Sequence, residues 1–388
     1  MLVYSTLLFL LIFGVFHFDY RKKTILKGWY YFFVFLFFTL MTGLRYRVGG
    51  DALAYEEYFY AFPDLDSYFS FMKKGNISFG YQPLFVLFVA ICKSINPDYY
   101  FYQFIHAVVT NIVLFWFIRK NTKFEFSTIL ILYLFLFYFY FTFDIQREIL
   151  AVCCFLLGYK YFAKNKWFFY YLFATIAFFF HISAFFLMLL PFFKLIKLTR
   201  IFVVLTIIVS IPLIIGKVFF LEYLELILFT EAMQSKGEAY SKVEFSISGV
   251  IFYYTIRVLT LIPFLFYYSK NKFEEKNYDW LLTAIFIVSI LSQVMVGSDR
   301  FNNYLYIPFV LFFVNFMFNK KYYFRTGIFK KTLIFTVYLF LFSVTGIKLL
   351  VGNFKNYYYY NVFFPYSSIL DKEENPDREK FMYYLWKQ

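Results

Sequence analysis

Apolar runs long enough to cross a lipid bilayer recur along the whole chain, and they constrain its fold more than any other feature. A helix of ~20 apolar residues crosses ~30 Å of hydrocarbon. The runs do not alternate between apolar and polar residues, so they predict helices rather than the strands of a membrane barrel. With 64 Phe and 39 Tyr among 388 residues, the chain has more aromatic side chains than a soluble core could bury. The sequence therefore predicts an all-α, polytopic integral membrane protein.

The net charge of +14 does not indicate a nucleic-acid partner, because membrane proteins carry their excess Lys and Arg in cytoplasmic loops. The cysteines Cys92, Cys153 and Cys154 lie in apolar segments, and two are adjacent, so no disulfide framework is expected. The three histidines and the cysteine spacing do not match a zinc site, and we expect no metal and no cofactor. Residues 1–18 lack a basic start and a cleavage site, which favours a retained helix over a signal peptide.

Basic clusters set the predicted orientation of the chain. If all of them face the cytoplasm, the chain crosses the membrane about 12 times, and both termini face outward. Residues 1–350 then form one membrane domain with a large outer segment at 45–98, and 351–388 form an outer tail. The clusters lie at 21–27, 119–123, 164–166, 194–200, 270–276 and 320–331. The predicted spans are 2–18, 28–44, 99–118, 126–143, 147–163, 167–180, 182–196, 201–220, 248–268, 279–297, 301–318 and 332–350.

The apolar stretch 82–95 is too short for an ordinary span. Pro83 suits the first position of a helix, and the Asn96-Pro97 pair ends it. We expect a helix that lies in the outer interface or enters the membrane partway. A full span here would invert every later segment and place the basic loops on the wrong side.

The segment between Lys166 and Lys194 is unusually tight. Going out and returning leaves about 14 residues per arm, or ~21 Å of helix, which is less than the hydrocarbon thickness. The turn at His181 is therefore predicted below the outer surface, at the floor of an outward-open cavity. The alternative is one long tilted helix without a turn.

Unusual polar residues share the outer side of this predicted topology. They are Arg45, Arg47 and Asp51 after the second helix, Gln146, Arg147 and Glu148, His181 and Ser183, and Asp299 and Arg300. Outer turns could simply be polar. These turns are very short, however, and three of them carry an arginine, so we interpret them as a site.

The chemistry of these residues favours a phosphorylated sugar. Arg147 and Arg300 are predicted at the outer start of inward-running helices, where the helix dipole and a guanidinium together bind phosphate. After the glycines of "RVGGDALAY", Asp51 and Tyr55 fall on one helical face, where a carboxylate above aromatic rings suits a sugar. Packing is the alternative explanation of the aromatic row.

Two further regions need an interpretation. Arg257 lies mid-helix, where a charge costs ~2.5–3.5 kcal/mol on insertion scales, so it could contact a lipid diphosphate or pair with a glutamate. The acidic and basic stretch at 372–380 is expected to be a solvated tail, and the tyrosines at 357–360 to be an interface anchor.

Four motifs, in this order, resemble the EpsG family of Wzy-like polymerases of exopolysaccharide, capsule and O-antigen. They read "RYRVGGDALAY", with Arg45 or Arg47 as the leading arginine, "QREILA", "HISAFF" and "SDRFNNY". The resemblance covers roughly residues 1 to 350. One departure is Glu148, where the family pattern leads us to expect an uncharged residue such as Gln.

The resemblance implies a glycosyltransferase with a GT-C-like arrangement on the outer face of the bacterial cytoplasmic membrane. Its substrates would be polyprenyl-diphosphate-linked oligosaccharides, and a chain-length regulator is a possible partner. The growing chain would leave its diphosphate for a hydroxyl of the incoming unit, without a metal. The base would be Asp51 or His181. The expected substrate-binding residues are Arg45, Arg47, Tyr55, Gln82, Arg147, Glu148, Arg257, Asp299, Arg300 and Tyr304.

Three other classes of protein remain open at this point. The first is a GT-C transferase that moves one sugar from polyprenyl phosphate, or a ligase that moves a whole glycan. The second is a transporter or flippase of lipid-linked sugars, which often shows internal repeats that are not visible here. The third is a structural membrane subunit, which would leave the outer arginines unexplained.

Overall fold

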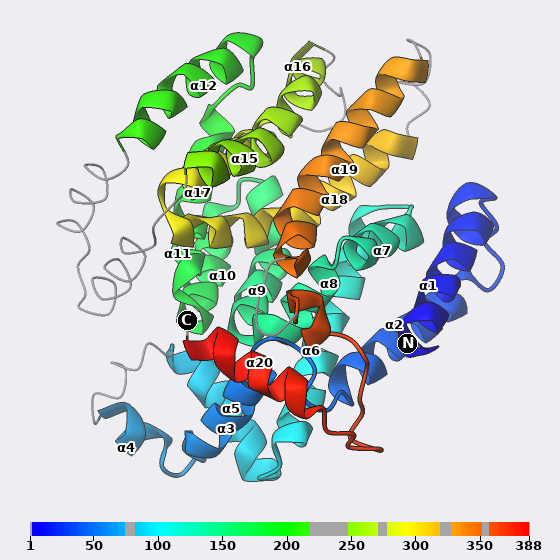
Figure 1. Ribbon diagram of the computed structural model, residues 1–388, viewed down its shortest axis with the longest axis vertical. Coiled ribbons are helices and arrows are strands. Elements are labelled where there is room, and N and C mark those ends of the chain that lie inside the picture. The colour runs from blue at the N-terminus through cyan, green and yellow to red at the C-terminus, as the bar shows by residue number, and fades with distance from the viewer. Residues whose placement is uncertain are drawn as a thin grey trace. The chain divides into compact units, whose positions relative to one another are not determined.

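The computed structural model describes residues 2–73, 82–216, 247–270, 278–318, 327–350 and 357–387 (Figure 1). Within these ranges the regular structure is helical, and the one β-bridge joins Arg45 to Ser368. The loop at 221–246 and the end of the predicted span 201–220 lie outside the described residues. The predicted all-α fold is confirmed.

Five helices in the described ranges are long and apolar enough to cross a membrane. They are Leu2–Tyr20, Tyr99–Asn121, Ser248–Lys270, Gly297–Phe318 and Lys330–Ile347. A sixth span results if Glu125–Leu134 and Phe137–Asp144, which meet at a 79° bend, are counted together. Shorter apolar helices cover Pro83–Ile95, Trp167–Phe180, Ile182–Leu195, Arg200–Ile215 and Asp279–Val294. A polytopic membrane protein is confirmed, while the number of about 12 spans stays a prediction.

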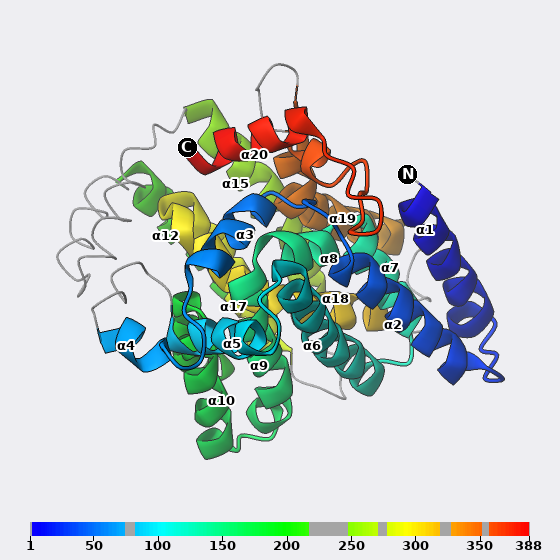
Figure 2. The ribbon, with the colours of Figure 1, turned by 90° about the horizontal axis from the view of Figure 1, so that it is seen from below.

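The described chain divides into two compact units. The first, unit 1, comprises residues 1–185 and 345–388, and the second, unit 2, comprises residues 186–344. In unit 1, α2 (Lys27–Gly43) packs along α6 (Tyr99–Asn121), and α9 (Gln146–Ala163) packs along α10 (Trp167–Phe180) (Figure 2). In unit 2, α17 (Asp279–Val294) packs against α18 (Asn303–Phe318), with α15 (Ile247–Arg257) and α16 (Ile262–Lys270) beside them.

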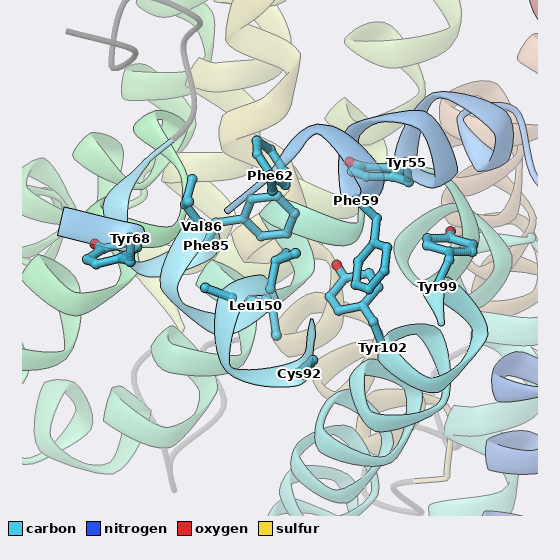
Figure 3. Packing of buried hydrophobic residues seen from close by; sticks show 12 residues of the cluster. Tyr55, Phe59, Phe62, Tyr68, Phe85, Val86, Cys92, Tyr99, Tyr102 and Leu150 are labelled. Atoms are coloured by element: carbon cyan, nitrogen blue, oxygen red, sulfur yellow. The ribbon is translucent and has the colours of Figure 1, made fainter. Parts of the chain in front are cut away.

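The predicted outer segment contains the short helices α3 (Ala52–Ala61), α4 (Tyr68–Lys73) and α5 (Pro83–Ile95). Gln82 is the extended N-cap of α5 and Pro83 its first residue, as predicted. Figure 3 shows how Tyr55 and Phe59 of α3 meet Tyr99 and Tyr102 of α6 in a buried cluster. The Phe59 ring lies 5.8 Å from Tyr99 and 5.7 Å from Tyr102 between centroids. Aromatic packing therefore fixes α3 on unit 1.

The helical path is broken at His181, as the short arms predicted. Helix α10 ends at Phe180, and His181 is extended, with φ −154° and ψ 133°. The 3₁₀ turn η4 (Ile182–Ala184) and α11 (Phe185–Leu189) follow. The alternative of one uninterrupted long helix is wrong, because the extended residue cannot continue an α-helical ladder.

The C-terminal segment is folded onto unit 1, although most of the charged stretch 372–380 is exposed, as predicted. Residues Pro376–Lys387 form α20, which packs on α3 (Figure 1). Phe381 and Arg378 of this helix are buried. In the predicted interface anchor, Tyr358 and Tyr360 are exposed, whereas Tyr359 is buried and its hydroxyl donates to the Asp144 carboxylate at 2.6 Å. Apolar residues spaced among the charges gave this helix a face to bury.

Candidate functional site

The loop between α2 and α3 begins at a wholly buried arginine. The Arg45 guanidinium donates to the carbonyl oxygens of Thr42 and Val48, the latter at 3.1 Å, and lies 4.7 Å above the Phe143 ring. Gln103 of α6 donates to the Arg45 carbonyl at 2.8 Å. In this structure Arg45 stabilises the loop from its buried side, because its guanidinium donates hydrogen bonds to backbone carbonyl oxygens.

Arg47 lies in the same loop in a left-handed conformation, with φ 49°. Its guanidinium contacts carboxylates of α3 and α20, at 3.1 Å from Glu56 and 3.0 Å from Glu379. Glu374 lies 3.8 Å away. Arg47 therefore ties the C-terminal helix to α3. Arg45, in contrast, forms no ion pair among the described residues, and its Nη2 atom is buried without a hydrogen-bond partner.

Asp144 holds the glycine turn that follows, and the sequence analysis did not single it out. The Gly50 amide donates to Asp144 Oδ1 at 2.7 Å, while Tyr359 donates to Oδ2. The signal was present in "FTFDIQREILA", where an aspartate stands three residues before Arg147 in an apolar setting. A buried carboxylate needs such donors to offset its lost hydration.

Gly49→Ala is expected to destabilise this turn by ~1–3 kcal/mol. Gly49 has φ +118°, and an added Cβ would lie 2.9 Å from the Cβ of Phe143 and 3.1 Å from its carbonyl oxygen. Thermal melting in detergent measures the loss. Gly28→Ala is the matched control, because its Cβ would meet only Arg119 at 3.6 Å. Equal melting temperatures for the two variants would contradict this account.

Arg147 meets the first motif through Tyr55. Arg147 is the second residue of α9, and it hydrogen-bonds the buried Tyr55 hydroxyl of α3. Burial raises the pKa of Tyr55, and the Arg147 charge opposes that rise, so the hydroxyl stays neutral at physiological pH. The exposed carboxylate of Asp51 also acts electrostatically on Tyr55. The structure thus brings together Asp51, Tyr55 and Arg147.

The start of α9 is anchored to α6 by polar contacts. His106 Nε2 lies 2.8 Å from the Gln146 carbonyl oxygen, and the Gln146 side chain donates to the Tyr99 hydroxyl at 3.3 Å. Sequence analysis did not predict His106, which is isolated in an apolar helix. These contacts fix the helix start on which both Arg147 and Glu148 depend.

The next residue, Glu148, connects the second motif to the third. Ser183 Oγ donates to Glu148 Oε1 at 3.1 Å, and it lies 2.7 Å from His181 Nδ1. All three side chains are buried, with His181 only 4% exposed. Glu148, the residue that departs from the family pattern, therefore ends a continuous row of Glu148, Ser183 and His181.

The row has two protonation patterns because a serine hydroxyl carries one proton. When Ser183 donates to Glu148, His181 Nδ1–H donates to Ser183, and Nε2 is left as an acceptor. When Ser183 donates to Nδ1, as its backbone amide does at 3.3 Å, Nε2 carries the proton and Glu148 must be protonated. The second pattern holds one proton more than the first. Nε2 therefore gains a proton from outside the row as protons shift from Nδ1 to Ser183 and from Ser183 to Glu148, so Glu148 and His181 are coupled.

In unit 2, two predicted residues share a neighbour. Arg257 ends α15 at a break in its span, and its guanidinium lies 5.0 Å above the Tyr253 ring. Arg257 and Asp299 both act electrostatically on Tyr306 of α18. Arg300 and Asp299 are exposed in the 3₁₀ turn η7 (Val296–Asn302), which directly precedes α18.

The remaining predicted residues are placed apart from these clusters. Tyr304 is completely buried in α18, where it contributes to packing. Gln82 is partly buried at the start of α5, and no described contact joins it to Arg147. Among the described residues, no three His, Cys, Asp or Glu side chains are arranged to hold a metal ion.

The apolar helices define the class, a polytopic all-α membrane protein. A comparison with protein-family models matches the EpsG family over residues 28–368. The chain belongs to the EpsG family, a Wzy-like polymerase family, as its motifs predicted. Searches of curated proteins and of solved structures each found no match. The family and the spans indicate a bacterial membrane protein acting on a lipid-linked substrate.

Proposed function

We propose that the chain polymerises polyprenyl-diphosphate-linked oligosaccharide units into a surface polysaccharide on the outer face of the cytoplasmic membrane. Membership of a polysaccharide polymerase family supports glycosyl transfer. The observation that carries the proposal is the start of α9. There, Arg147 hydrogen-bonds Tyr55, and the adjacent carboxylate of Glu148 is connected to His181 through Ser183.

Arg147 is proposed to bind the diphosphate of the donor. The first turn of α9 has backbone amides without helical partners and the positive end of the helix dipole. A guanidinium there adds two parallel donors that match phosphate oxygens. Tyr55 orients the guanidinium from the side of α3. This arrangement stabilises the negative charge that develops as the diphosphate leaves.

His181 is proposed as the general base, and Asp51 as a ligand of sugar hydroxyls. The acceptor hydroxyl oxygen bonds to the anomeric carbon of the donor chain, while the bond from that carbon to the diphosphate oxygen breaks. The hydroxyl proton passes to His181 Nε2, and the electron pair leaves with the diphosphate. Nε2 can accept this proton in the pattern in which Nδ1–H donates to Ser183 and Ser183 donates to Glu148. Contributions of Arg257 and Arg300 to diphosphate binding stay predictions.

Deletion of the gene is expected to collapse the polysaccharide ladder to single repeat units, with each unit complete. The reason is that joining units, and not building them, requires this chain. Gel analysis of lipid-linked glycans and mass measurement of the single unit test the result. The wild-type gene supplied on a plasmid is the control. A unit lacking one sugar would instead identify a monosaccharide transferase, and an unchanged ladder would exclude both activities.

A further inference from the structure

A hollow in unit 1 lies where α2 begins and α6 ends. The loop that carries Asp51 follows the opposite end of α2, and Figure 2 shows α2 and α6 side by side. The hollow has a volume of about 380 Å³, and it is lined by Gly28, Trp29, Phe32 and Arg119. The proposed glycosyl transfer uses none of these residues. The basic clusters at 21–27 and 119–123 flank the hollow, so it lies on the side that the sequence assigns to the cytoplasm.

The hollow exists because Gly28 has no side chain. A Cβ at this position would meet only Arg119 Nη2, at 3.6 Å, within ordinary contact distance. Trp29 is 66% exposed and Phe32 is 46% exposed, so two aromatic side chains present apolar surface at the rim. Tryptophan in such a place is typical of the boundary between headgroups and acyl chains.

Arg119 supplies a positive charge to this hollow. Its guanidinium lies 5.4 Å above the buried Tyr31 ring, which limits its orientation. Across the residues that the structure describes, no carboxylate pairs with it. Its neighbour Lys27, in contrast, forms an ion pair with Glu125. The Arg119 guanidinium is thus held in place by the Tyr31 ring, and no described carboxylate balances its charge through an ion pair.

We propose that this hollow binds the headgroup of an anionic phospholipid. A guanidinium presents parallel donors to phosphate oxygens, and the nearby Glu125 carboxylate pairs with Lys27 rather than with Arg119. Trp29 and Phe32 would contact the glycerol backbone and the first methylenes of the acyl chains. The surrounding lysines and arginines concentrate anionic lipid at the same surface. Charge complementarity and the aromatic rim together favour a lipid over a soluble anion.

The test measures lipid binding to the full-length protein in detergent. Phosphatidylglycerol is expected to raise the melting temperature of the wild type more than phosphatidylcholine does, because a ligand of the folded state stabilises it. Arg119→Gln is expected to weaken phosphatidylglycerol binding about fivefold, as native mass spectrometry would measure. Gly28→Leu, which fills the hollow and keeps the charge, is expected to weaken binding likewise. Arg21→Gln is the matched control, because that guanidinium lies over Phe16 outside the hollow.

Three results would overturn the proposal. The first is equal stabilisation of the wild type by the anionic and the zwitterionic lipid. The second is equal loss of phosphatidylglycerol binding in Arg119→Gln and Arg21→Gln, which would show a diffuse charge effect. The third is full competition by inorganic phosphate, which would identify a soluble-anion site. Polysaccharide ladders from the same variants keep this question separate from the proposed polymerase activity.

Discussion

Arg147→Ala is expected to abolish polymer while the protein still inserts into the membrane. The change removes the guanidinium at the start of α9 and leaves the developing charge of the diphosphate without its cation. Losing one well-placed donor to such a charge costs ~10²-fold or more in rate. Arg147→Lys is expected to recover little, because a point charge cannot replace the two parallel donors. The measurement is chain elongation by purified protein, alongside the ladder in cells.

Arg21→Gln provides the control for this experiment, because it removes the same charge far from α9 and is expected to leave elongation unchanged. Membrane-inserted protein must be quantified for each variant, since Arg147 also hydrogen-bonds Tyr55 and could affect folding. Normal chain length in Arg147→Ala, at normal protein level, would rule out the diphosphate assignment.

The membrane architecture was largely predictable because it follows from local rules. Apolar length and basic loops located the long helices, and the described bounds of Tyr99–Asn121 and Ser248–Lys270 lie within a few residues of the prediction. The break at His181 was predicted from the same arithmetic, and the extended backbone of His181 excluded the alternative of one long tilted helix. Motif order then identified the family before any geometry was known.

The roles of individual polar residues were less predictable, because tertiary contacts decide them. Arg45 and Arg47 are two positions apart in a loop without periodicity. Arg45 is buried and donates to backbone carbonyl oxygens, whereas Arg47 forms ion pairs with carboxylates of α3 and α20. Nothing local in the sequence distinguishes these environments. The partnership of Asp144 with Tyr359 is separated by 215 positions, so no sequence pattern could reveal it.

Glu148 shows how a departure from a family pattern can gain a physical meaning. At the sequence level its charge was unexplained in an apolar helix. In the structure it accepts a hydrogen bond from Ser183 Oγ, which in turn contacts His181. A buried carboxylate without such donors would be costly, so the row both stabilises Glu148 and orients the imidazole. We therefore propose that the acid acts through Ser183 as a positioning residue rather than by touching substrate.

His181→Gln is accordingly expected to lower the elongation rate by ~10²–10⁴-fold, the usual contribution of a general base. Glu148→Gln and Ser183→Ala are expected to lower it less, because Nε2 remains but its tautomer is no longer held. The distinguishing measurement is the pH profile of kcat/KM. A base works unprotonated, so activity falls on the acidic side. This fall is the acidic limb of the pH profile. In Glu148→Gln the imidazolium loses the stabilising carboxylate, so the acidic limb should move to lower pH.

The conservative change Ser183→Thr is the control for this row, because it retains the hydroxyl, and it is expected to keep more activity than Ser183→Ala. A merely structural role for Glu148 would lower the amount of folded protein without moving the acidic limb. The proposal that His181 is the base therefore fails if His181→Gln elongates chains at the wild-type rate. The proposal that Glu148 positions it fails if Glu148→Gln has a normal rate and an unshifted limb, since the imidazole would then hold its productive tautomer without the row.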